Sequence, residues 1–277
     1  MTLAGKKLSI AFPDTVLEEH DSLREKTVKL GQIARACSVF GVDCVQVFHD
    51  PRGGGESGLI RRVMEYLETP QYLRRRLFPL DESLKYAGLL PPLRIPSHKP
   101  KVPVENLRPG DYREGAVLED GLTVDVGLDR PLTLRRAVGR QKRLTVRVTS
   151  VAPLQGIPAD RSQVPEYWGY AVEDRSVEQV LSDSRFGLKI ATSRLGEPLA
   201  KCLGDLGEQV RISGSVMALF GAPSRGLFDM TGDLPGRVSF VVNLYPEQHV
   251  ATVRTEEAIN SALYLLEVLG VSQNTKV

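Results

Sequence analysis

Two polar loops in the C-terminal third of the chain have the composition of a ligand-binding site. Residues 220–227 are rich in Gly, Pro and Arg, and residues 243–259 combine Asn, Gln, Thr, Arg and Glu. Each loop follows an apolar segment typical of a buried strand, and the second runs into an apolar helical pattern. Loops held between buried elements commonly carry binding groups. Two such loops at the carboxyl ends of two strands predict a ligand crevice at one edge of an α/β sheet.

Composition places this chain of 277 residues among ordinary globular proteins of one or two domains. No apolar run approaches the roughly 20 residues of a membrane-spanning helix, and the N-terminus lacks a signal-peptide pattern. Cys37, Cys44 and Cys202 lie in apolar surroundings, which favours reduced thiols and a cytoplasmic location. No cysteine or histidine spacing indicates a zinc site, so we expect no metal. Because no apolar run is long enough to span a bilayer, we also expect no membrane partner.

The net charge of +2 is unevenly distributed. Residues 98–164 contain twelve Lys or Arg and eight acids, so this segment carries +4 and the remainder −2. Clustered basic side chains contact phosphates in nucleic-acid-binding proteins, although many such runs are only solvated surface. The candidates for phosphate contacts are Arg135, Arg136, Arg140, Lys142, Arg143 and Arg147.

The elements that must position these groups alternate between strand and helix at both ends of the chain. Strands are predicted at 7–12 and 44–48, and helices at 22–40 and 58–78, the last broken at Pro70. Beyond Trp168 the alternation resumes, with strands at 169–172, 188–191, 210–219 and 238–244 and helices at 176–183, 196–206 and 255–269. This order is typical of a parallel sheet covered by helices.

The segment between these two halves has a different pattern. Five prolines within residues 91–103 mark a boundary. Short strand patterns follow at 115–118, 122–126 and 144–151, separated by glycines, as is typical of a small all-β barrel. We therefore predict one α/β catalytic domain, residues 1–97 and 165–277, with a small OB-like barrel inserted at residues 98–164.

Several of these residues resemble motifs of the SPOUT-class RNA methyltransferases. The resemblance is carried by Phe220-Gly-Ala-Pro-Ser-Arg-Gly-Leu227 and by Arg254-Thr-Glu-Glu-Ala258, and it favours the archaeal and eukaryotic branch with an OB-like barrel inserted in the catalytic domain. It implies an α/β fold with a knotted Rossmann-like parallel sheet, whose C-terminal segment forms a trefoil knot. It also implies a homodimer that acts on RNA, in particular ribosomal RNA.

The resemblance further implies that S-adenosylmethionine binds among three loops and is released as S-adenosylhomocysteine. These loops would be residues 192–195, 219–227 and 243–255. The cofactor-binding residues expected from them are Thr192, Ser193, Leu219, Phe220, Gly221, Pro223, Gly226, Leu227, Asn243, Leu244, Pro246, Gln248, Val253 and Thr255.

Base methylation, with N3 of a uridine as the favoured acceptor, is the reaction that the resemblance implies. Negative charge would develop on the carbonyls that flank this nitrogen, and a nearby cation would stabilise it. The candidates for catalysis are Arg225, Arg254 and Arg35, with Glu256 as a base or as the partner of an arginine. Each also has an ordinary interpretation, because surface arginines commonly pair with acids and acids stabilise the first turn of a helix.

Two other functions stay open at this point. A non-catalytic RNA-binding or ribosome-assembly protein could keep the same fold, and it would bind RNA without the cofactor. A nucleotide-binding α/β enzyme with an accessory barrel is disfavoured. The chain has neither a Gly-x-x-x-x-Gly-Lys-Ser/Thr phosphate loop nor a Gly-x-Gly-x-x-Gly motif after its first strand.

Overall fold

The computed structural model describes residues 5–139 and 142–270, which form two compact units. The first unit contains the chain up to Glu65, Lys85–Pro91 and the chain from Tyr170 onward. The second contains Tyr66–Leu84 and Pro92–Gly169, so a stretch before the proline-rich boundary joins the barrel segment. The division of functions between the two predicted domains remains a prediction.

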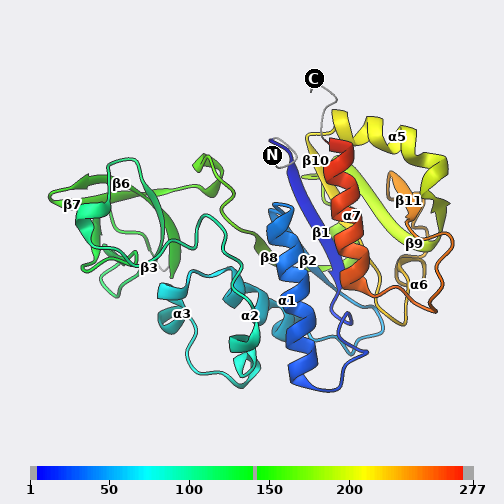
Figure 1. Ribbon diagram of the computed structural model, residues 1–277, viewed down its shortest axis with the longest axis horizontal. Coiled ribbons are helices and arrows are strands. Elements are labelled where there is room, and N and C mark those ends of the chain that lie inside the picture. The colour runs from blue at the N-terminus through cyan, green and yellow to red at the C-terminus, as the bar shows by residue number, and fades with distance from the viewer. Residues whose placement is uncertain (1–4, 140–141, 271–277) are drawn as a thin grey trace. The chain divides into compact units, whose positions relative to one another are not determined.

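The first unit is built on a six-stranded parallel sheet with the strand order β11-β9-β10-β1-β2-β8 (Figure 1). Strand β1 lies between β2 and β10, so strands from opposite ends of the chain share the centre of the sheet. This confirms the predicted α/β class, whereas the trefoil knot remains a prediction. The strands are β1 (Lys7–Pro13), β2 (Cys44–His49), β8 (Ala171–Ser176), β9 (Leu188–Pro198), β10 (Ser215–Leu219) and β11 (Phe240–Asn243).

Helices cover both faces of this sheet. Helix α7 packs against α1 and α5, and Figure 1 shows α1 and α7 side by side. Helices α4 and α6 pack on a buried cluster that includes Ala11, Met217 and Leu219. Because Ile10 alternates with Ala11 along β1 and is also buried, neither face of the strand is open to solvent. The helices of this unit are α1 (Leu23–Val39), α2 (Ser57–Glu68), whose last residues belong to the second unit, α4 (Val177–Leu181), α5 (Leu199–Ile212), α6 (Leu227–Thr231) and α7 (Thr255–Gly270). Helix α3 (Gln71–Leu77) belongs to the second unit.

The second unit contains a closed five-stranded barrel with the order β3-β4-β5-β7-β6. Strands β5 and β7 pair in parallel and the other neighbours are antiparallel, which gives a small barrel of the predicted OB-like kind. Its interior is filled by apolar side chains, among them Val124, Leu132 and Val146. The strands are β3 (Tyr112–Val117), β4 (Thr123–Asp125), β5 (Leu132–Leu134), β6 (Arg143–Val151) and β7 (Leu154–Ala159).

Some predicted boundaries were wrong for physical reasons. The strand expected at 210–219 begins at Ser215, because residues 210–212 form the end of α5. Strands β5 and β7 were missed because Pro131 and Pro158 lie next to or within them and prolines usually mark turns. Within the described part of the chain, no helix combines the length and apolar character needed to cross a membrane.

Candidate functional site

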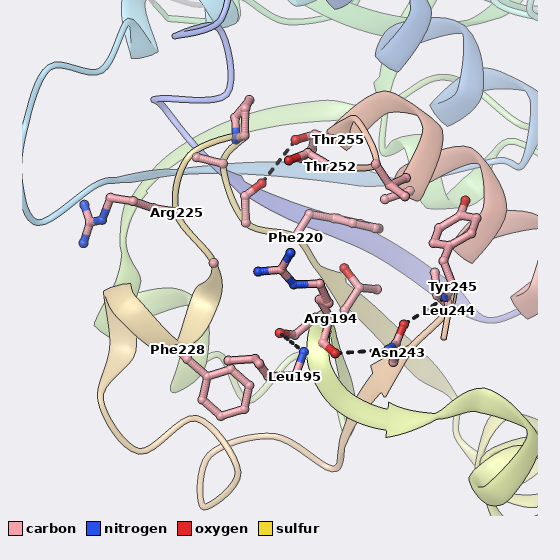
Figure 2. A pocket seen from close by; sticks show the side chains of 18 of the residues that line it. Arg194, Leu195, Phe220, Arg225, Phe228, Asn243, Leu244, Tyr245, Thr252 and Thr255 are labelled. Atoms are coloured by element: carbon pink, nitrogen blue, oxygen red, sulfur yellow. Dashed lines mark hydrogen bonds between the residues drawn. The ribbon is translucent and has the colours of Figure 1, made fainter. Parts of the chain in front are cut away.

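A cleft of about 340 Å³ opens at the carboxyl ends of β10 and β11 and beside residues 192–195 in the middle of β9. Its walls come from three segments of the first unit, residues 192–195, 220–229 and 243–258 (Figure 2). The volume falls within the range of about 300–1,000 Å³ that is usual for small-molecule sites. The crevice predicted at this edge of the sheet is therefore present.

Most residues predicted to bind the cofactor line this cleft. Leu219 and Leu227 differ, because their side chains are 1% exposed and belong to the core beneath the cleft. Pro246 also differs, since it is exposed and is not among the lining residues. The predicted residues in the walls are Thr192, Ser193, Phe220, Gly221, Pro223, Gly226, Asn243, Leu244, Gln248, Val253 and Thr255.

Other lining residues were not singled out by the sequence. Phe228 and Asp229 come from the first turn of α6, and Ala258 comes from the first turn of α7. These helices begin at the edge of the cleft. The sequence signal that could have identified the three residues is their position in the first turn of a helix. The remaining ones lie inside the predicted loops and are Arg194, Leu195, Ala222, Ser224, Tyr245, Ala251 and Thr252; Arg225, a candidate for catalysis, also lines the cleft.

The loop that follows β10 turns tightly at Gly221. A Cβ atom at this position would lie 2.8 Å from the carbonyl oxygen of Arg225 and 3.1 Å from the Cα of Gly226. The hydroxyl of Thr255 donates a hydrogen bond of 3.3 Å to the carbonyl of Gly221. Because the loop closes on itself and is attached to the start of α7, its backbone forms a fixed wall of the cleft.

Two of the residues predicted to bind the cofactor also make hydrogen bonds to the loops that line the cleft. Asn243 Nδ2 donates to the carbonyl of Arg194 at 3.0 Å, and Asn243 Oδ1 accepts from the N–H of Tyr245 at 3.0 Å. Gln248 Nε2 donates to the carbonyls of Val250 and Ala251 at 2.9 and 3.1 Å. Both amides therefore position the third segment of the cleft.

Arg225 is attached to the N-terminal half of the sheet. Its guanidinium pairs with Asp50, which directly follows β2, and its Nη2 donates to the carbonyl of Asp229 at 3.1 Å. Burial opposes ionisation of Asp50, but hydrogen bonds from the N–H of Arg52 and from Arg225 hold its pKa below the usual value. Figure 2 shows the Arg225 side chain pointing away from the cleft. This geometry favours a role in anchoring the loop.

Glu256 is also paired. Its carboxylate lies 3.2 Å from Nζ of Lys29, and these side chains are 10% and 1% exposed. Lys29 pairs in addition with Glu19. A carboxylate held by a buried lysine stabilises the packing of α7 on α1, and Glu256 is absent from the lining of the cleft.

Arg254 and Arg35 are exposed and do not line the cleft. Helix α7 begins at Thr255, and the carbonyl of Arg254 accepts its first hydrogen bond, from Ala258, so Arg254 occupies the N-cap position. The N–H of Arg254 donates to Glu257 at 3.0 Å. The backbone of Arg254 thus starts the helix.

Only some of the basic residues predicted to contact phosphates are exposed to solvent. Arg135, Arg136, Lys142 and Arg147 are exposed, and Arg140 lies outside the described residues. Arg143 differs from the expectation, because its Nη1 and Nε lie 2.6 Å from Glu68 and Glu114, whose side chains are 3% and 1% exposed. Arg143 neutralises these buried acids and stabilises the barrel unit.

Comparison with known proteins identifies the family. A family described as "Putative RNA methyltransferase" matches residues 7–266, which include the barrel and the strands that form the cleft. The chain belongs to this family. Membership confirms the class of RNA methyltransferase expected from the two loops, and it implies an RNA substrate and a methyl donor.

Individual relatives can be aligned with this sequence over most of its length. An uncharacterized protein of Halobacterium salinarum is 36% identical over 281 residues, which are 92% of this chain and 96% of that protein. The 28S rRNA (uridine-N(3))-methyltransferases of Mus musculus and Homo sapiens are each 29% identical over 296 residues. These alignments cover 94% of this chain and 76% and 77% of the mouse and human proteins.

Proposed function

We propose that this protein transfers a methyl group from S-adenosylmethionine to N3 of a uridine in ribosomal RNA. Family membership supports methyl transfer to RNA, and the names of the mouse and human relatives support the uridine atom. The observation that carries the proposal is the cleft at the ends of β10 and β11, beside the interruption of β9. Its walls are the three loops expected to hold the donor.

The residues of the cleft fit such a donor. At Gly221 a Cβ atom would collide with the backbone of Arg225 and Gly226, so only glycine allows the tight turn that holds this loop in the wall of the cleft. Leu244 and Val253, which are partly exposed in the walls of the cleft, offer apolar surface to a purine, and Asp229 offers a carboxylate to an ammonium group. The donor supplies a methyl group already activated on a positive sulfur. The protein then has to position donor and acceptor and to stabilise the charge that develops.

The barrel is the proposed RNA-binding module. Arg135, Arg136, Lys142 and Arg147 are exposed on it, and basic side chains on a small barrel bind phosphates. A homodimer and a cytoplasmic location remain predictions, the second supported by free, buried thiols at Cys37, Cys44 and Cys202.

Titration calorimetry with S-adenosylhomocysteine tests the cofactor site. We expect saturable binding to the wild type, and at least about tenfold weaker binding to Gly221→Ala, because overpacking costs about 1–3 kcal/mol. Gly214→Ala is the matched control, since Gly214 lies just before the other end of β10 and an added Cβ there meets no atom within 4 Å.

The same titration separates the proposal from its alternative. A folded wild-type protein that binds RNA but does not bind S-adenosylhomocysteine, with or without that RNA, would be a non-catalytic RNA-binding protein. Equal affinity of Gly221→Ala and the wild type would place the ligand outside this cleft.

A further inference from the structure

Strand β9 is interrupted by a loop where it passes the cleft. Val241 of β11 pairs with Ala191, but the next residue, Val242, pairs with Glu197. Residues 192–196 therefore leave the sheet between two paired positions of the same strand. We name this segment the β9 loop.

The backbone of the β9 loop is fixed on both sides. The hydroxyl of Thr192 donates to the carbonyl of Leu219 at 3.1 Å, and Asn243 Nδ2 donates to the carbonyl of Arg194 at 3.0 Å. Gly196 packs so closely against β11 that a Cβ atom would lie 2.7 Å from the carbonyl oxygen of Val241. The main chain of Arg194 is thus held while its side chain is exposed.

Arg194 directs its guanidinium into the cleft. Figure 2 shows it extending from the β9 loop toward residues 220–226, whereas Arg225 points away. Arg194 and Arg225 are the two arginines among the residues that line the cleft, and Arg225 forms an ion pair with Asp50. The adjacent Leu195 is 74% exposed, so the β9 loop lies at the open rim, where a macromolecular acceptor has to enter.

We propose that Arg194 contacts the acceptor base and stabilises the negative charge that develops on it. This inference rests on the proposed function. The acceptor nitrogen loses its proton to solvent and keeps the electron pair, which forms the new N–C bond. The bond from the methyl carbon to sulfur breaks, and its electrons remain on the thioether. A guanidinium beside the flanking carbonyl oxygens donates hydrogen bonds to the charge before the new bond is complete.

The test compares wild type, Arg194→Gln and Arg194→Lys in single-turnover methylation of in-vitro-transcribed large-subunit ribosomal RNA. We expect the rate of Arg194→Gln at pH 7 to fall by about 100-fold, the usual effect of removing one such donor. Because the guanidinium favours the deprotonated acceptor, its loss should move the inflection of the pH–rate profile upward by about one pH unit. Arg194→Lys keeps the charge, so its inflection should stay near that of the wild type.

The affinity for S-adenosylhomocysteine, measured on the same three proteins, distinguishes a role of Arg194 in contacting the acceptor from a role in binding the donor. Our inference requires affinities that agree within about twofold. Weaker binding in parallel with the slower rate would assign Arg194 to the donor and overturn the inference, as would wild-type turnover by Arg194→Gln. Arg24→Gln, at an exposed position on α1 outside the cleft, controls for the loss of one positive charge. Failure of the wild type to bind S-adenosylhomocysteine would instead refute the proposed function.

Discussion

Glu173 of the edge strand β8 is held by a bidentate ion pair. Nη1 and Nη2 of Arg185 donate to its two carboxylate oxygens at 2.8 and 2.6 Å, and Arg175 donates at 2.8 Å. The hydrogen bonds from Arg185 lower the pKa of Glu173 from 4.5 to about 2. A carboxyl group whose pKa is lower in the folded protein contributes stability above its unfolded pKa. That contribution is lost as the pH falls toward the folded pKa.

We therefore expect Glu173→Gln to lower the free energy of unfolding at pH 7 by on the order of 1 kcal/mol, because the pair is partly exposed. The difference from the wild type should shrink between pH 4.5 and pH 2, the window set by this pKa. Urea unfolding at pH 7, 4.5 and 3 measures it. A difference that stays constant with pH would show that Glu173 stabilises the strand without its charge.

Charged side chains are the group whose roles the sequence could least predict. Arg143, Arg225 and Glu256 were candidates for function, and each is paired with a residue far away in the chain, such as Glu68 for Arg143 and Asp50 for Arg225. A local pattern shows that a charge is present but does not show its partner. Arg194, by contrast, lies in the segment 192–195, which was expected to be a cofactor-binding loop, and only the geometry of β9 directs its side chain into the cleft.

Among the elements, the β9 loop depends on Gly196. Replacing Gly196 with Ala places a Cβ atom against the carbonyl of Val241, so the loop has to move away from β11. We expect Gly196→Ala to weaken S-adenosylhomocysteine binding and to slow methylation by about tenfold or more, since overpacking costs about 1–3 kcal/mol. Calorimetry and single-turnover rates check this, with Gly214→Ala as the control. Unchanged values for both would mean that the loop does not shape the site.

Elements with a long apolar period were predictable, and short or interrupted ones were not. Helix α1 and the break at Pro70 agree with the sequence, because burial of one face repeats over several turns and proline removes a backbone donor. Strand β9 was expected to end near Ala191, yet it resumes at Glu197 after the β9 loop. Pairing with β11 decides this return, and a partner strand about fifty residues away leaves no local signal.

At the scale of the molecule, the proposal assigns donor and RNA to different units. Reversing two exposed charges of the barrel, Arg135→Glu with Arg136→Glu, should weaken RNA binding and reduce the slope of log affinity against log salt by about 1–2. The affinity for S-adenosylhomocysteine should stay unchanged, the opposite of Gly221→Ala. Filter binding at several salt concentrations and calorimetry measure the two effects.

Arg24→Glu with Lys201→Glu makes the same change in net charge at exposed positions outside the barrel. An equal loss of RNA affinity in this control would attribute the effect to overall charge. If the barrel variant lost binding of both ligands, the two units would not divide the functions.

The position of β1 at the centre of the sheet has a consequence for biosynthesis. Lys7 of β1 is paired with Ser215 of β10, so about two hundred further residues must be synthesised before both edges of β1 are paired. The barrel strands, which end at Ala159, are all synthesised earlier. Because domains fold as units while the chain emerges, the barrel can be complete on the ribosome before the cleft exists. Translation that stops between the two would release a folded barrel attached to a β1 whose β10 edge is unpaired and prone to aggregation.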